Sequence, residues 1–137
     1  MAQWRALVDV PGTNRGPAAG RHVTAAVLPA WGLAHLVESA QLVVSELITN
    51  AYQHSPQSDS FELELSQRGK GLRIALADGS AIRPVVRELS SDGETGRGMV
   101  IVQTLAKRWG AEDHHGGKRV WVDLDEPVDG IDDTVID

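Results

Sequence analysis

The sequence predicts one α+β domain, a two-layer α/β sandwich in which helices cover one face of a mixed, mostly antiparallel sheet. The chain has 137 residues, the size of a single ordinary domain. Apolar residues make up 42% and charged residues 23%, proportions typical of a folded globular protein. The expected strands are joined mostly by hairpin turns and the expected helices fall between them, an order typical of α+β proteins.

The first half of the chain predicts a strand, then two helices. Residues 4–10 alternate loosely between apolar and polar and end at Pro11, which indicates a strand. Residues 22–31 are rich in Ala, Val and Leu, and Gly32 closes the expected helix. Residues 34–54 show the strongest helical period. The apolar arc of this second helix contains Leu36, Ala40, Val43, Val44, Leu47, Ile48 and Ala51, and the positions opposite it are Gln41, Ser45, Thr49 and Tyr52.

The second half predicts two hairpins separated by a loop and a helix. Residues 61–65 and 72–77 form the first hairpin around the turn at residues 69–71. Residues 81–95 have no period, and a loop of that length is usually functional or disordered. A helix over residues 96–108, capped by Gly110, precedes a last hairpin formed by residues 111–115 and 119–124.

Composition and charge exclude several classes of function. The chain has no cysteine, which excludes disulfide scaffolds, thiolate zinc sites and cysteine nucleophiles. No apolar run is long enough for a membrane helix and the N-terminus lacks a secretory pattern, so a cytoplasmic protein is expected, with no membrane partner. Seven acids and no Lys or Arg follow from Asp123 onward, whereas the remainder is near neutral, which argues against direct nucleic-acid binding. The domain is expected to span residues 1–124, and residues 125–137 are expected to form an acidic, disordered tail.

The clearest candidate site lies on the second expected helix. Glu46 and Asn50 are one helical turn apart, and His54 follows one turn later. An amide oxygen is a suitable ligand for Mg²⁺, and a carboxylate can orient or deprotonate a water or hydroxyl. The alternative is an ordinary polar flank of an amphipathic helix.

Two further candidates lie at the ends of elements. Asp78-Gly79-Ser80 follows an apolar strand, where a carboxylate can accept a hydrogen bond from an exocyclic amino group and the glycine admits a flat ring. Gly96-Arg97-Gly98 opens a helix, whose N-terminal amides can bind phosphate with help from the arginine. A plain Asp-Gly turn and a flexible hinge are the respective alternatives.

In this order, the three features resemble the ATPase superfamily of gyrases, chaperones, histidine kinases and mismatch-repair proteins. Residues 43–55 (VVSELITNAYQHS) resemble its N box, and residues 76–84 (LADGSAIRP) resemble its first glycine box. Residues 95–110 (TGRGMVIVQTLAKRWG) resemble its second glycine box, and residues 116–122 (GGKRVWV) resemble the last hairpin of the actinobacterial anti-sigma-factor, serine-protein-kinase branch.

The resemblance implies a function and a role for each candidate. Glu46 would be the catalytic base and Asn50 the Mg²⁺ ligand, with residues 85–95 as the ATP lid. The implied ATP-binding set is Asn50, His54, Asp78, Ser80, Gly96, Arg97, Gly98 and Met99, in which Asp78 binds the adenine amino group and the residues from Gly96 to Met99 bind phosphates. Proteins of this branch form homodimers, bind a sigma factor and phosphorylate a serine on a small antagonist protein. The same activity, partners and homodimer are therefore expected here, with ATP and Mg²⁺ as cofactors.

Arg119 departs from the branch, which often has threonine in the adenine network at that point. A guanidinium cannot accept a hydrogen bond. This departure favours the main alternative, a non-catalytic module that sequesters a partner and has a vestigial nucleotide pocket. A partner-dependent ATPase without kinase activity is the third possibility. The retained Glu46 favours catalysis.

Overall fold

The computed structural model describes residues 3–54, 59–78, 102–115 and 117–125. The elements follow one another as β1 (Arg5–Pro11), α1 (Gly16–Ala30), a 3-10 turn (Ala34–Leu36), α2 (Val37–His54), β2 (Ser60–Arg68), β3 (Gly71–Asp78), β4 (Arg108–His114) and β5 (Gly117–Leu124). Residues 102–105 add one described helical turn before β4.

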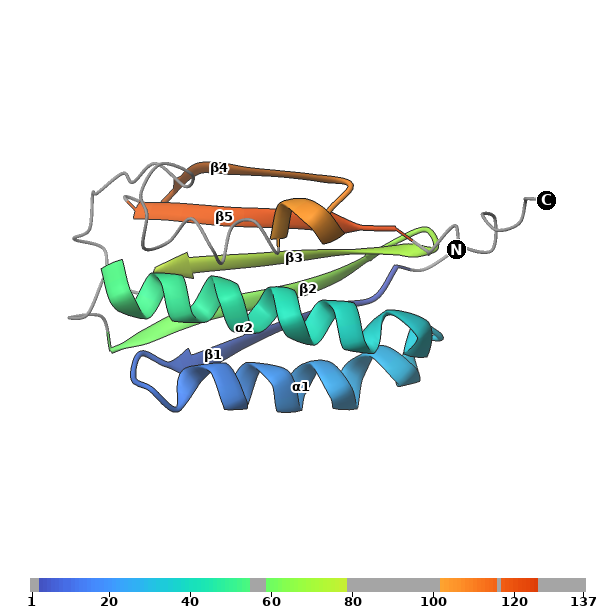
Figure 1. Ribbon diagram of the computed structural model, residues 1–137, viewed down its shortest axis with the longest axis horizontal. Coiled ribbons are helices and arrows are strands. Elements are labelled where there is room, and N and C mark those ends of the chain that lie inside the picture. The colour runs from blue at the N-terminus through green and yellow to red at the C-terminus, as the bar shows by residue number, and fades with distance from the viewer. Residues whose placement is uncertain (1–2, 55–58, 79–101, 116, 126–137) are drawn as a thin grey trace.

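The strands form one five-stranded sheet in the order β1-β2-β3-β5-β4. All four pairings between these described strands are antiparallel. Both helices lie on the same side of the sheet, with α1 against β1 and α2 against β3 and β5 (Figure 1). The predicted two-layer α+β sandwich is therefore confirmed, and we call the side of the sheet that carries neither of these two helices its open face.

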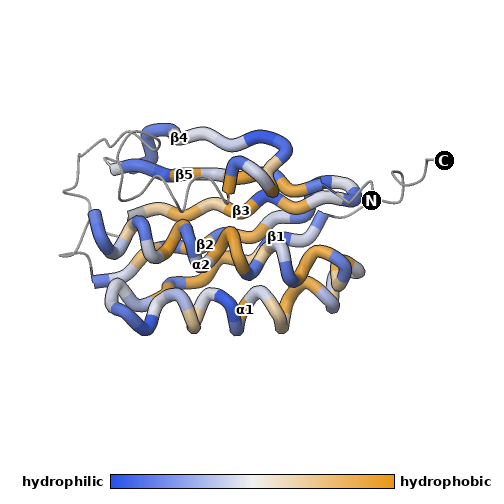
Figure 2. The backbone as a smooth tube through the Cα atoms, in the orientation of Figure 1, coloured by the Kyte–Doolittle hydropathy of each residue, from blue (hydrophilic) through white to orange (hydrophobic). Residues whose placement is uncertain are grey.

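The predicted apolar arc of α2 forms the centre of the core. Ala40, Val43, Val44, Leu47 and Ile48 are all buried, and they meet the buried inner positions of the sheet, Phe61, Leu63, Leu65, Leu72, Ile74, Leu76, Val122 and Leu124. Figure 2 shows apolar residues along β3 and along the sides of the helices that meet the sheet. One expected polar position was wrong, because Tyr52 packs partly against this core.

Helix α1 begins six residues before the predicted start, at Gly16. Glycines lower intrinsic helix propensity, so the sequence pattern did not include this turn. Here they allow close packing, because a Cβ on Gly20 would lie 2.5 Å from Ile48 Cδ1 and 2.7 Å from Val44 Cγ1 of α2. The first turn also contains a proline, which is well tolerated at that position.

The first hairpin agrees with its prediction, but the start of β4 does not. In the turn between β2 and β3, Gly69 adopts a φ of +60°, which favours glycine. Strand β4 begins at Arg108, so Gly110 lies within a strand and does not cap a helix. A Cβ on Gly110 would come within 2.9 Å of the Trp121 ring, so this glycine allows the indole to lie flat against β4.

Among the described helices, none is both long enough and apolar enough to cross a membrane.

Candidate nucleotide site and the open face of the sheet

Helix α2 presents Glu46 and Asn50 from one flank, as the sequence predicted. Both side chains are half-buried, and His54 is exposed at the last residue of the helix. Within the described part of the chain, the Glu46 carboxylate has neither a hydrogen-bond nor an ion-pair partner, whereas Asn50 does make a polar contact. The Glu46 carboxylate is partly exposed, so a ligand or water can reach it.

The contacts of α2 with α1 show which flank this is. Arg21 of α1 donates from Nη1 to Ser45 Oγ at 2.7 Å, and Gln41 donates from Nε2 to the Arg21 carbonyl oxygen at 3.0 Å. Successive residues turn by about 100° around a helix, which places Glu46 and Asn50 about 100° and 140° from Ser45. The two candidate residues therefore lie on the flank turned away from α1.

The end of β3 and the helical turn before β4 are the described parts of the other two candidate elements. β3 ends at Asp78, and Figure 1 shows the C-terminal ends of α2 and β3 at the same end of the fold. The helical turn at residues 102–105 places Val102, fully buried, in the core shared with α2, so this turn lies on the helix-covered face of the sheet. The C-terminal ends of α2 and β3 therefore lie at the same end of the fold, and the turn at residues 102–105 packs on the same face of the sheet as α2.

Several predicted site residues lie outside the described part of the structure. These are the side chain of Asp78, the expected lid at residues 85–95, and Ser80, Gly96, Arg97, Gly98 and Met99. Their roles stay predictions.

The oxygen donors on α2 are of the chemical kind that binds magnesium. Amide and carboxylate oxygens suit Mg²⁺, which usually takes one or two protein ligands together with phosphates and water. Among the described residues, no group of three or more His, Asp or Glu side chains could form a metal cage of protein ligands alone. Asn50 and Glu46, one helical turn apart, supply one amide and one carboxylate oxygen donor group, the number of protein ligands that such a magnesium ion takes.

The comparison with protein families agrees with this geometry. The family model for the histidine kinase-like ATPase domain matches residues 12–124. The chain belongs to the histidine kinase-like ATPase family. The matched span begins directly after β1, runs through the end of β5 and includes every predicted site residue from Glu46 to Met99. A search of curated proteins gave no match.

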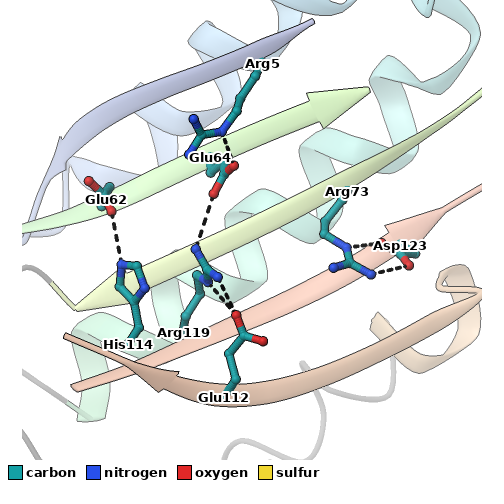
Figure 3. Close-up of polar contacts among 8 residues, drawn as sticks. All are labelled: Arg5, Glu62, Glu64, Arg73, Glu112, His114, Arg119 and Asp123. Atoms are coloured by element: carbon teal, nitrogen blue, oxygen red, sulfur yellow. Dashed lines mark hydrogen bonds and ion pairs between the residues drawn. The ribbon is translucent and has the colours of Figure 1, made fainter. Parts of the chain in front are cut away.

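The open face of the sheet carries a second polar surface, which the sequence analysis missed (Figure 3). Arg119 of β5 donates to Glu112 of β4, from Nε at 2.9 Å and also from Nη2, and its Nη1 lies 3.5 Å from Glu64 Oε1 of β2. Arg5 of β1 donates to the other oxygen of Glu64. Small side chains on the central strand, including Ala75, leave room for these contacts across β3.

This arrangement changes the interpretation of Arg119. Side chains alternate between the two faces of a strand, and the neighbours Val120 and Val122 pack toward the core under the helices. Arg119 therefore points away from α2, and its departure from the family pattern does not place a guanidinium in a site on the helix-covered face. The alternation of apolar and charged residues along β5 was the signal that could have shown this.

Asp123 is the most buried acid among the described residues, with 7% of its surface exposed. It accepts hydrogen bonds from Arg73 Nε at 2.7 Å, Arg73 Nη2 at 2.9 Å and Arg108 Nη2 at 3.2 Å. Burial alone raises the pKa of Asp123, but the Arg73 hydrogen bonds and the two positive charges outweigh burial and hold that pKa below its ordinary value. The Arg73 guanidinium also lies 4.2 Å from the centre of the Trp121 ring. These contacts tie β3, β4 and β5 together from the open side.

Proposed function

We propose that this chain binds ATP with Mg²⁺ on the flank of α2 that carries Glu46 and Asn50. The observation that carries the proposal is the half-buried Glu46 carboxylate, which has no protein partner among the described residues and lies within the span that matches the ATPase family. Asn50 would hold the metal, and the residues from Gly96 to Met99 would hold the phosphates. The metal, when bound, would neutralise charge on the transferring phosphoryl group.

We further propose that the chain is an anti-sigma factor with serine-protein kinase activity. In this reaction the serine oxygen of an antagonist protein forms a bond to the γ-phosphorus of ATP, the bond to the β-phosphate oxygen breaks, and ADP leaves. Glu46 would accept the proton of the serine hydroxyl. Support comes from the family match and from the branch-like sequence of the last hairpin. A sigma factor and a homodimer belong to the same proposal.

The alternative is a binding module without catalysis. The main observation in its favour was Arg119, and its side chain lies on the open face. A non-catalytic module requires no half-buried carboxylate beside the metal ligand, so Glu46 favours the kinase.

Calorimetry tests nucleotide binding directly. We expect the wild-type chain to bind ATP more tightly with Mg²⁺ than with a chelator. Asn50→Ala should remove this metal dependence, because a hydrogen bond or ligand contact to a charged group is worth about 1.5–3 kcal/mol, roughly ten- to a hundredfold in affinity. Gln53→Ala, an exposed change on the same helix, is the matched control and should bind like wild type. Absence of ATP and ADP binding at millimolar ligand would refute the proposal.

Radiolabelled ATP tests the kinase step. Glu46→Gln keeps the size and polarity of the side chain but cannot accept the proton, so we expect unchanged ATP affinity and a loss of transfer of about a hundred- to ten-thousandfold. The substrate is an antagonist protein recovered by pull-down with the wild-type chain. Equal transfer by wild type and Glu46→Gln would show that the catalytic assignment is wrong. Absence of transfer from wild type, with normal ATP binding, would favour the binding module.

A further inference from the structure

A basic hollow lies on the open face, on the opposite side of the sheet from the proposed nucleotide site. Its volume is about 200 Å³, and Ala75 contributes to its lining at the centre. Its charged lining consists of four arginines and two glutamates: Arg5, Arg68, Arg73, Arg119, Glu64 and Glu112. The hollow therefore has a surplus of positive charge.

One of these arginines has no ion-pair or hydrogen-bond partner among the described residues, whereas the other three do. Arg5 and Arg119 pair with the two glutamates, and Arg73 pairs with Asp123. The guanidinium of Arg68 has no ion-pair or hydrogen-bond partner among the described residues, although the side chain lines the hollow. A free planar cation at the rim of a positively charged hollow favours binding of a carboxylate.

An exposed apolar anchor adjoins the hollow. A second, shallower depression of about 540 Å³ shares Arg5 and Arg68 with the first and is also lined by Trp4. Trp4 is 56% exposed, a large value for an indole. The two depressions together offer a positively charged lining and an exposed indole, which suit an extended segment that has both carboxylates and apolar side chains.

We propose that residues 126–137 of this chain dock across these two depressions. The segment contains five acids, no Lys or Arg, and four branched apolar residues: Glu126, Asp129, Asp132, Asp133 and Asp137, with Val128, Ile131, Val135 and Ile136. Its charge and its apolar residues complement Arg68 and Trp4. The inference is independent of the proposed kinase function, because it concerns the other face of the sheet.

The position of Asp125, the last described residue, supports docking of the segment that follows it. A Cβ on Gly71 would lie 3.1 Å from Asp125 Oδ1, so Asp125 lies beside the β2–β3 turn that follows Arg68. An ion pair of 3.1 Å to Lys107 also holds Asp125. Twelve extended residues span up to about 40 Å, which is more than enough to cross one face of a small domain. Covalent attachment gives such a segment an effective concentration of about a millimolar, so even weak contacts favour docking within one chain.

Paramagnetic broadening in the full-length chain tests the proposal. The chain has no cysteine, so Thr134→Cys provides a single site for a nitroxide label and keeps every acid of the segment. We expect the amide signals of Arg68 and Gly69 to lose at least half their intensity, and the signals of α1 to be unchanged. About 1 M NaCl shortens the Debye length to about 3 Å and should restore the lost intensity.

Two substitutions test the role of charge. Arg68→Gln should restore most of the lost intensity. Arg15→Gln is the matched control, since Arg15 is also exposed and its guanidinium also lacks a partner among the described residues, but it lies beside α1. Broadening that survives both high salt and Arg68→Gln would overturn docking through this hollow, and so would the absence of broadening at Arg68 and Gly69.

A mixed sample separates attachment within one chain from contact between copies. Isotope-labelled chain without nitroxide is mixed with unlabelled chain that carries it. We expect no broadening in this sample. The comparison sample is the chain that carries both the isotope label and the nitroxide. Equal broadening in the mixed sample would show that the segment docks on a second copy, which would overturn the proposal.

Discussion

Replacing Asp123 by asparagine tests the ion pairs of the open face most directly. The substitution keeps the shape of the side chain and removes its charge. The carboxylate accepts three hydrogen bonds from Arg73 and Arg108, and its side chain is only 9% exposed. Hydrogen bonds to a charged group contribute about 1.5–3 kcal/mol. Because Arg108 is 64% exposed, solvent screens its share, and we expect a loss of about 2 kcal/mol at neutral pH.

The same contacts predict how this loss depends on pH. The folded state lowers the pKa of Asp123, so its contribution to the free energy of unfolding is fully present above the ordinary pKa of about 3.9. The contribution disappears as the pH falls through that value and then through the lower pKa of the folded state. Wild type and Asp123→Asn should therefore differ at pH 7 and converge in acid.

Urea unfolding at a series of pH values measures both effects. With a slope of about 1–3 kcal/mol per molar urea, a loss of 2 kcal/mol moves the midpoint by about 1 M. The matched control is Asp113→Asn in the same hairpin, since Asp113 pairs with Lys118 at 3.1 Å but is 93% exposed, and we expect a change below about 0.5 kcal/mol. Equal midpoints for wild type and Asp123→Asn at pH 7, or a difference that persists unchanged in acid, would refute this account of the ion pairs.

Two further substitutions test the packing of α1 and the orientation of Arg119. Gly20→Val should lower stability by about 1–3 kcal/mol in thermal unfolding although valine has the higher helix propensity, because the added side chain would overlap Val44 and Ile48. Ala18→Val on the exposed side of the same helix should cost no more than about 0.7 kcal/mol, and equal effects of the two changes would contradict the close approach of α1 and α2. Arg119→Gln should leave ATP affinity in calorimetry within about twofold of wild type, because its partners lie on the open face, and a tenfold change would return Arg119 to the nucleotide site.

The sequence predicted those elements in which local pattern and tertiary environment agree. The α2 arc has a clear helical period, and β2 alternates residue by residue between buried Phe61, Leu63 and Leu65 and the polar residues between them. The start of α1 and the start of β4 could not be found in this way. In both, a glycine weakens the local pattern. The glycine is needed because a side chain distant in sequence packs against it, Ile48 against Gly20 and Trp121 against Gly110.

The candidate site was predictable only where its residues share one helix. Glu46 and Asn50 are one turn apart, so their common flank follows from helical geometry alone. The side of the molecule on which that flank lies depends on Arg21 and Ser45, a contact between residues 24 positions apart in the chain. No local period encodes such a contact.

The sheet separates the two proposals physically. In β5, Val120 and Val122 pack toward the helices, whereas Arg119, Trp121 and Asp123 take part in the contacts of the open face. The same alternation in β2 directs Leu63 to the core and Glu64 to the open face. A substitution on one face therefore leaves the contacts of the other in place. We expect Asn50→Ala to change metal-dependent ATP binding without affecting the broadening at Gly69, and Arg68→Gln to do the reverse. If each variant disturbed both measurements equally, the two surfaces would be coupled through the sheet, and neither effect could be assigned to its own face.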